Sequence, residues 1–176
     1  MNRILPAYAA LIIALGIGWA SPSQALDCSV SAPAVLSISD TVGSFTLTFT
    51  NFVSGTVSSS QAITYTVQGN KMLAGTVNGA VTASLGTAFS GMSLECDVGT
   101  YTNLGDADHA LLAESSSGFF AVGATSTALA NKTPGSGSGD TCLDGTLGVT
   151  WRTVLQADLK SGSQNRTLTV TLKDGN

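Results

Sequence analysis

The sequence predicts an all-β fold, an antiparallel β-sandwich with immunoglobulin-like or Greek-key connections. Apolar residues alternate with Ser and Thr in several runs, and glycine-containing turns separate those runs at short intervals. Only 10% of the 176 residues are charged, whereas helical bundles are rich in Glu, Lys and Arg. A small closed barrel is the alternative, because the same alternation also fits its strands.

The first 25 residues have the pattern of a cleaved export signal. An apolar run extends from Ala9 to Ala20, and Ser23 and Ala25 provide the small side chains that signal peptidases accept. This run of about 12 residues is shorter than the ~20 that cross a bilayer as a helix. We therefore expect residues 26–176 to form one secreted domain at the cell surface, outside the cell or in the periplasm. Membrane contact is expected only through the signal before cleavage.

Period-two alternation predicts the strands of this domain in order. In each run one face is apolar and the other carries hydroxyl side chains, as in strands that lie between a core and water. The expected strands cover residues 28–38, 45–49, 63–67, 77–85, 147–153 and 167–172.

Two segments depart from this pattern. Residues 106–115 could form one or two helical turns, with Asp106 as the N-terminal cap. Residues 130–140 are rich in Gly and Ser and are expected to form a flexible surface loop.

The first expected strand follows the cleavage site directly and alternates almost perfectly. Because Pro33 restricts it to a sheet edge, we expect residues 28–38 to act as a donated or exchangeable strand that links subunits. The alternative, an ordinary first strand of the same sandwich, stays open. The apolar face of this assembly strand consists of Val30, Ala32, Ala34, Leu36 and Ile38.

Three cysteines allow one disulfide in an exported chain. Cys96 and Cys142 both lie in polar segments that resemble turns, so we expect them to pair and Cys28 to stay free or bond another chain. A bond from Cys28 to either of the other two is the alternative. Three scattered thiols and one histidine do not provide the short ligand spacing of a metal site.

No arrangement of residues indicates catalysis, so neither an enzyme nor a cofactor is expected. His109 is the one histidine, and no Gly-x-Ser-x-Gly nucleophile motif is present. Asp106 and Asp108 resemble part of a calcium loop, but Ala110 stands where the next ligand would be. Calcium binding near these two acids stays open.

Binding surfaces are also sparse. Tyr65 and Trp151 lie on the apolar faces of their strands and are expected in the core. Tyr101, Phe119 and Phe120 are the aromatic candidates for exposure on a sugar-binding surface.

Charge and modification patterns complete the survey. The net charge is −4 and no basic patch is present, so nucleic-acid binding is not expected. Asn131 and Asn165 match the N-glycosylation pattern, and whether they are modified stays open.

An export signal, the early cysteine in Asp27-Cys28-Ser29, Thr-rich alternating strands and the closing run 164–172 occur together in this chain. This combination resembles bacterial secreted fimbrial and spore-coat-U-type subunits. The resemblance implies a non-catalytic structural or adhesive subunit of a pilus-like fibre or coat. Its partners would be further copies of itself or other surface subunits. A secreted carbohydrate- or protein-binding module is the alternative.

Overall fold

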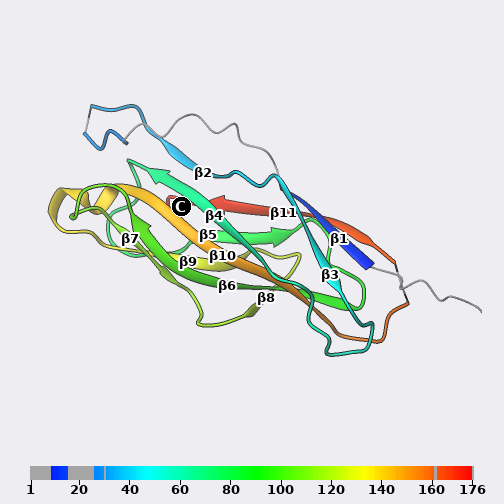
Figure 1. Cartoon of the computed structure of the whole chain (residues 1–176). Coiled ribbons are helices and arrows are strands. Elements are labelled where there is room, and N and C mark those ends of the chain that lie inside the picture. The colour runs from blue at the N-terminus through cyan, green and yellow to red at the C-terminus, as the bar shows by residue number, and fades with distance from the viewer. Residues whose placement is uncertain (1–8, 16–25, 30, 161, 176) are drawn as a thin grey trace, which may run out of the picture.

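Two packed β-sheets make up the protein, as a computed structural model shows for residues 9–15, 26–29, 31–160 and 162–175 (Figure 1). The first sheet has the strand order β3-β1-β11-β5-β9-β7, and the second has the order β2-β4-β10-β6-β8. This arrangement confirms the predicted all-β sandwich. The strands are β1 (Ala9–Leu15), β2 (Leu36–Asp40), β3 (Ser44–Phe49), β4 (Gln61–Gly69), β5 (Val77–Leu85), β6 (Met92–Asn103), β7 (Leu111–Glu114), β8 (Phe120–Val122), β9 (Thr127–Thr133), β10 (Leu143–Leu155) and β11 (Gln164–Leu172).

The core lies between the sheets and is formed by the alternating apolar positions. On β3, Phe45, Leu47 and Phe49 are buried while the residues between them are exposed. Trp151, on β10, is fully buried at the centre of the second sheet. Burying one face of each sheet in this way removes the apolar side chains from water, which is the main stabilising contribution to a sandwich.

Two segments, residues 106–115 and 130–140, differ from expectation. Residues 106–115 contain a turn followed by β7, so the predicted helix is wrong. The predicted loop at 130–140 is also wrong in part, because β9 extends to Thr133 and a short 3-10 helix covers Gly137–Thr141. The buried ammonium group of Lys132 orders this region, as described below.

The expected assembly strand is only partly a strand. β2 begins at Leu36 and pairs antiparallel with β4 of the same chain, with Ile38 opposite Val67. Ala32 is buried but Ala34 and Leu36 are exposed, so the even positions do not form one buried face. Val30 lies outside the described residues. The expectation of a continuous strand over 28–38 is therefore wrong.

The strand β1 lies inside the first sheet, between β3 and β11 (dark blue, cyan and red in Figure 1). Its residues 9–15 belong to the apolar run of the expected export signal. It pairs antiparallel with β3 and parallel with β11, the one parallel pair among the described strands. No helix in the described part of the chain is long and apolar enough to cross a membrane.

Candidate functional site

The strand position held by β1 is the first feature that bears on function. Six residue pairs join β1 to β3, from Ala9 opposite Phe49 to Ala14 opposite Ser44. Five join it to β11, from Leu11 opposite Gln164 to Leu15 opposite Leu168. Neighbouring strands lie ~4.8 Å apart, so β3 and β11 are separated by about twice that distance. Backbone hydrogen bonds cannot cross such a gap, and both strands depend on the strand between them.

Buried side chains flank this position on both sides. Phe45, Leu47 and Phe49 of β3 are at most 6% exposed, and Leu168 of β11, opposite Leu15, is 1% exposed. Residues directly opposite each other on paired strands point to the same face of a sheet. The register places Ala9, Leu11 and Ile13 opposite the three buried β3 residues Phe49, Leu47 and Phe45.

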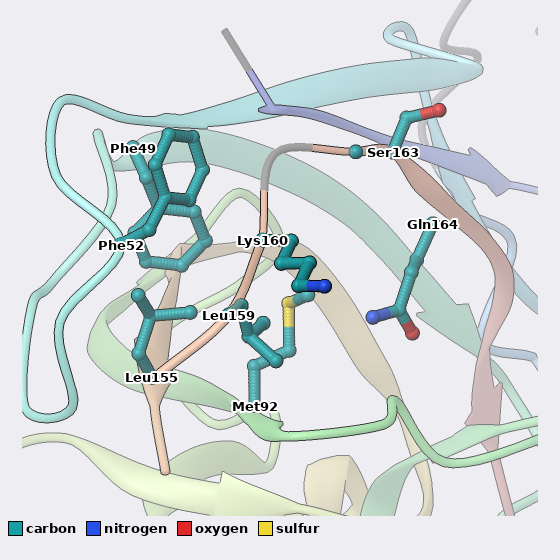
Figure 2. Close-up of a pocket in the computed structure, with 9 residues that line it drawn as sticks. Phe49, Phe52, Met92, Leu155, Leu159, Lys160, Ser163 and Gln164 are labelled. Atoms are coloured by element: carbon teal, nitrogen blue, oxygen red, sulfur yellow. The ribbon is translucent and has the colours of Figure 1, made fainter. Parts of the chain in front are cut away.

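A cavity of about 230 Å³ lies at the end of the sandwich where β1 begins (Figure 2). Figure 2 shows the rings of Phe49 and Phe52 on one side of the cavity and Gln164 across from them. Gln164 is held in place because its side chain exchanges two hydrogen bonds with the backbone of Ser90, at 3.0 and 2.9 Å. The remaining wall consists of the apolar side chains of Met92, Leu155 and Leu159 together with Lys160, Gly162 and Ser163.

The disulfide lies in the N-terminal region of the domain and joins Cys28 to Cys142, with the two Cα atoms 5.9 Å apart. The predicted Cys96–Cys142 bond is wrong. Cys96 lies on β6 opposite Trp151, is fully buried and has no disulfide partner. Burial raises the pKa of its thiol to about 12, so it stays protonated and unreactive at neutral pH.

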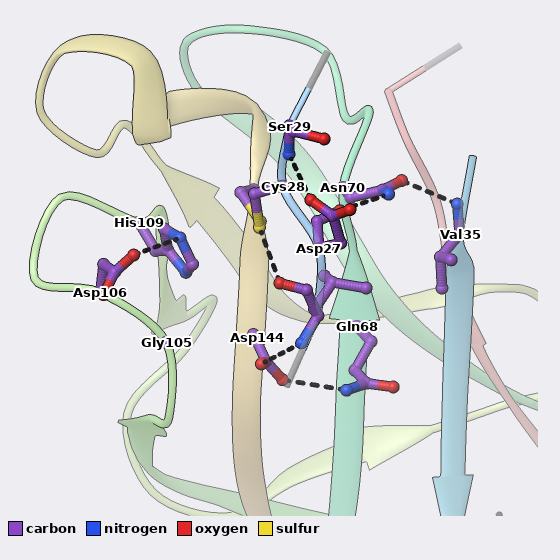
Figure 3. The surroundings of a disulfide bond; sticks show 12 residues. Asp27, Cys28, Ser29, Val35, Gln68, Asn70, Gly105, Asp106, His109 and Asp144 are labelled. Atoms are coloured by element: carbon purple, nitrogen blue, oxygen red, sulfur yellow. Dashed lines mark hydrogen bonds and ion pairs between the residues drawn. A yellow bond between two sulfur atoms is a disulfide. The ribbon is translucent and has the colours of Figure 1, made fainter. Parts of the chain in front are cut away.

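Polar side chains also hold the segment around the disulfide, from Leu26 to Val35 (Figure 3). Asn70 is 4% exposed, and its amide donates to the carbonyls of Asp27 and Pro33, both at 2.8 Å. The Asn70 side-chain oxygen accepts from the Val35 amide at 2.8 Å. The Asp144 carboxylate accepts from the Leu26 amide at 3.3 Å. The segment is thus fixed to its own sandwich at several points.

His109 lies beside the disulfide and is only 6% exposed. Its Nε2 atom is 3.8 Å from the Asp106 carboxylate, and its ring lies against Gly105. Potential ligand atoms of His109 and both cysteines lie within 4.8 Å of one another. The two sulfur atoms are bonded to each other, however, so they are not available as thiolate ligands.

Asp106 and Asp108, the two acids near which calcium binding was left open, lie close to His109. A histidine nitrogen is a poor ligand for Ca²⁺, which takes six to eight oxygen atoms. Within this cluster, Asp106 and Asp108 provide two carboxylate groups, which are fewer ligands than a complete calcium site contains.

The aromatic residues named as candidates for a sugar-binding surface are buried or half-buried. Tyr65 and Trp151 are buried, as predicted, but Tyr101 is also buried at 9% exposure, which is contrary to expectation. Phe119 is half-buried, with the Arg152 guanidinium 3.7 Å above its ring, and Phe120 is half-buried as well.

Arg152 is itself paired with Glu95 at 2.8 Å. This packing ties Phe119 to the sandwich.

Lys132 was not identified from the sequence and is fully buried. Its ammonium group donates to the Gly75 carbonyl at 2.6 Å and to the Asp140 carboxylate at 3.1 Å. Asp140 also accepts from the backbone amides of Gly75 and Gly135, at 2.6 and 3.1 Å. These contacts join three loops and lower the pKa of Asp140, chiefly through the Gly75 hydrogen bond.

The two glycosylation-pattern asparagines differ in environment. Asn165 is exposed on β11, whereas Asn131 is half-buried and accepts a hydrogen bond from the Gly79 amide at 2.7 Å.

Comparisons with known proteins add no family. No protein-family model matches the chain, and no curated protein matches it significantly. The fold and the site define the protein as a disulfide-bonded, two-sheet β-sandwich. Its disulfide fits an oxidising environment such as the extracellular space or periplasm.

Proposed function

We propose that this protein is an exported, non-catalytic structural subunit of a cell-surface fibre or coat. In this proposal it completes its first sheet with a strand from another chain. The observation that carries the proposal is that β1, an interior strand of the sandwich, comes from the apolar run that the sequence predicts to be an export signal.

Signal cleavage after Ala25 would remove β1 and open the sheet. The backbone donors and acceptors of β3 and β11 that face this position would lose their partners. Water would then reach side chains that are now buried, among them Leu47 and Leu168. A sheet opened in this way pairs readily with an extended segment of another chain, which restores the ladders and covers the apolar face.

Other features support a structural role rather than catalysis. Export agrees with the disulfide, which forms in oxidising compartments. The buried Cys96 thiol has a raised pKa and is unsuited to nucleophilic attack. The outward positions of β3 are Ser and Thr, which give an uncharged, hydroxyl-rich surface.

The native protein provides the test of this function. Material isolated from the cell surface should begin at Leu26 and should occur in a stable assembly larger than one chain. Electron microscopy with antibody labelling should place it in a fibre or coat that disappears when the gene is deleted. A native protein that is monomeric, with the amides of β3 and β11 slow to exchange, would contradict the proposal.

A further inference from the structure

The proposed function leaves the donor of the missing strand undefined, and the following inference rests on that function. We infer that the strand filling the β1 position in the mature protein comes from a different polypeptide, and not from the N-terminus of this chain or of a second copy. The protein then accepts a strand at this site without donating one from its N-terminus.

The length of the mature N-terminus is the first argument. After cleavage at Ala25, only Leu26 and Asp27 precede Cys28, which is bonded to Cys142. Two extended residues span about 7 Å, but a seven-residue strand such as β1 spans about 23 Å. The free N-terminal residues are therefore too few to fill the position.

The residues after Cys28 are not free to leave either. Asn70 binds the backbone at Asp27, Pro33 and Val35, and β2 pairs with β4 from Leu36 onward. Donating residues 28–38 would require breaking these hydrogen bonds and the β2–β4 ladder while the disulfide still holds one end. The expectation that this segment links subunits is therefore not supported by its contacts.

The position of the disulfide argues against the N-terminus of the same chain filling the β1 position. Cys142 lies directly before β10, whereas Leu155 at the far end of β10 lines the cavity where β1 begins. Thirteen strand residues separate these ends by roughly 43 Å. The tethered N-terminus therefore lies at the opposite end of the sandwich from the start of the open position.

The flanking strands define the chemistry of the donor. It must be an extended segment of about seven residues without proline, because both of its edges join backbone ladders. It runs antiparallel to β3 and parallel to β11. Apolar side chains are needed at the positions opposite Phe49, Leu47 and Phe45, which face the core.

The cavity adds one requirement at the start of the donor strand. Phe49 lines the cavity and is also the register partner of position 9, the first residue of β1. A donor with a large apolar residue at or just before this position can bury it against Phe52 and Leu159. The amine of Lys160 lies at the same cavity. In the donor strand, an acidic residue next to the large apolar residue is therefore favoured over a basic one.

The test uses disulfide-bonded protein of residues 26–176, folded with and without synthetic peptides. One peptide has the sequence of residues 9–15, AALIIAL, with terminal lysines for solubility. A control carries proline in place of Ile12, and a third peptide covers residues 26–40. The first should bind at 1:1 stoichiometry and raise the Tm by several degrees. The other two should leave the Tm unchanged, and the protein alone should form no ordered polymer.

A photo-cross-linking residue at Thr46, which pairs with position 12 of β1, identifies what enters the site. Ordered polymers of 26–176 with Thr46 cross-linked to residues 26–40 of a second copy would overturn the inference but leave the proposed function standing. If protein of residues 26–176 does not bind the AALIIAL peptide and its β3 and β11 amides are protected from hydrogen exchange without it, both the inference and the proposed function are overturned. Binding of that peptide alone, without self-polymerisation, supports the inference.

Discussion

At the scale of single residues, the disulfide is the strongest constraint on the chain. Cys28 and Cys142 are 114 positions apart, so their bond closes a loop that includes most of the domain. In the chain-entropy model a loop of this length stabilises the folded state by about 5 kcal/mol. The bond also fixes the N-terminal segment where Asn70 and Asp144 can bind its backbone.

Reduction should therefore destabilise the protein strongly. We expect a reductant to lower the denaturant midpoint of the wild-type protein, with a loss of up to about 5 kcal/mol in the free energy of unfolding. The double variant Cys28→Ser/Cys142→Ser should unfold at the lower midpoint with or without reductant. Equal midpoints for wild-type protein under both conditions would show that the bond contributes no stability.

The ion pair of Lys132 and Asp140 is the second constraint at this scale. Asp140→Asn leaves the buried ammonium group without its carboxylate, and breaking a buried pair in this way costs about 3–5 kcal/mol. Because the folded-state pKa of Asp140 is lowered, its stabilising contribution is complete above its unfolded pKa, near 4. The contribution is lost as the pH falls through the lower, folded-state pKa.

Urea unfolding between pH 2 and pH 7 checks this prediction. The stability difference between wild-type and Asp140→Asn protein should be largest at pH 5–7 and should shrink toward pH 2. Glu114→Gln removes the same charge from an exposed position and serves as the control, with a small effect. A difference that is independent of pH would show that the carboxylate charge does not act as described.

At the scale of elements, β6 and β10 form the longest pairing among the described strands. A Cβ atom at Gly145 would lie 2.3 Å from the Thr102 carbonyl oxygen and 2.4 Å from the Tyr101 ring. The side chain of Tyr101 covers this glycine, which accounts for its unexpected burial. The close approach of β6 to β10 at Gly145 therefore requires a residue without a side chain at this position.

Gly145→Ala should thus destabilise the domain by about 1–3 kcal/mol, the usual cost of overpacking a core. Gly148→Ala is a matched control on the same strand, because nothing lies within 4 Å of a Cβ built there. Thermal unfolding of both variants compares the two sites directly. A similar Tm for both would mean that Tyr101 moves aside without cost.

The elements also show which sequence patterns are informative. β3 and β5 were predicted closely because their alternation is regular and their ends coincide with turns. β6 was missed, although Leu94, Cys96 and Val98 alternate and are buried, because the acids beside Cys96 resemble a turn. The disulfide was mispaired for the same reason. The role of Lys132 depends on loops far apart in sequence, which local pattern cannot reveal.

At the scale of the whole molecule, the two sheets should differ in their dependence on residues 1–25. None of the described residues of that segment, 9–15, lies in the second sheet, whose central strand β10 is paired on both sides within residues 26–176. The first sheet has β1 at an interior position. Removing the segment should consequently loosen one sheet and leave the other intact.

Amide hydrogen exchange measures this difference strand by strand. In protein of residues 26–176, the β3 amides that face β1 should exchange at least ~100-fold faster than in the uncleaved chain, because open strand edges exchange through low-energy local fluctuations. The amides of β10 should keep their protection, and the AALIIAL peptide should restore that of β3. If β3 stays protected without β1, it has moved against β11 and the sheet closes without a donor. Loss of protection in both sheets would show instead that the sandwich folds as one unit that requires its missing strand.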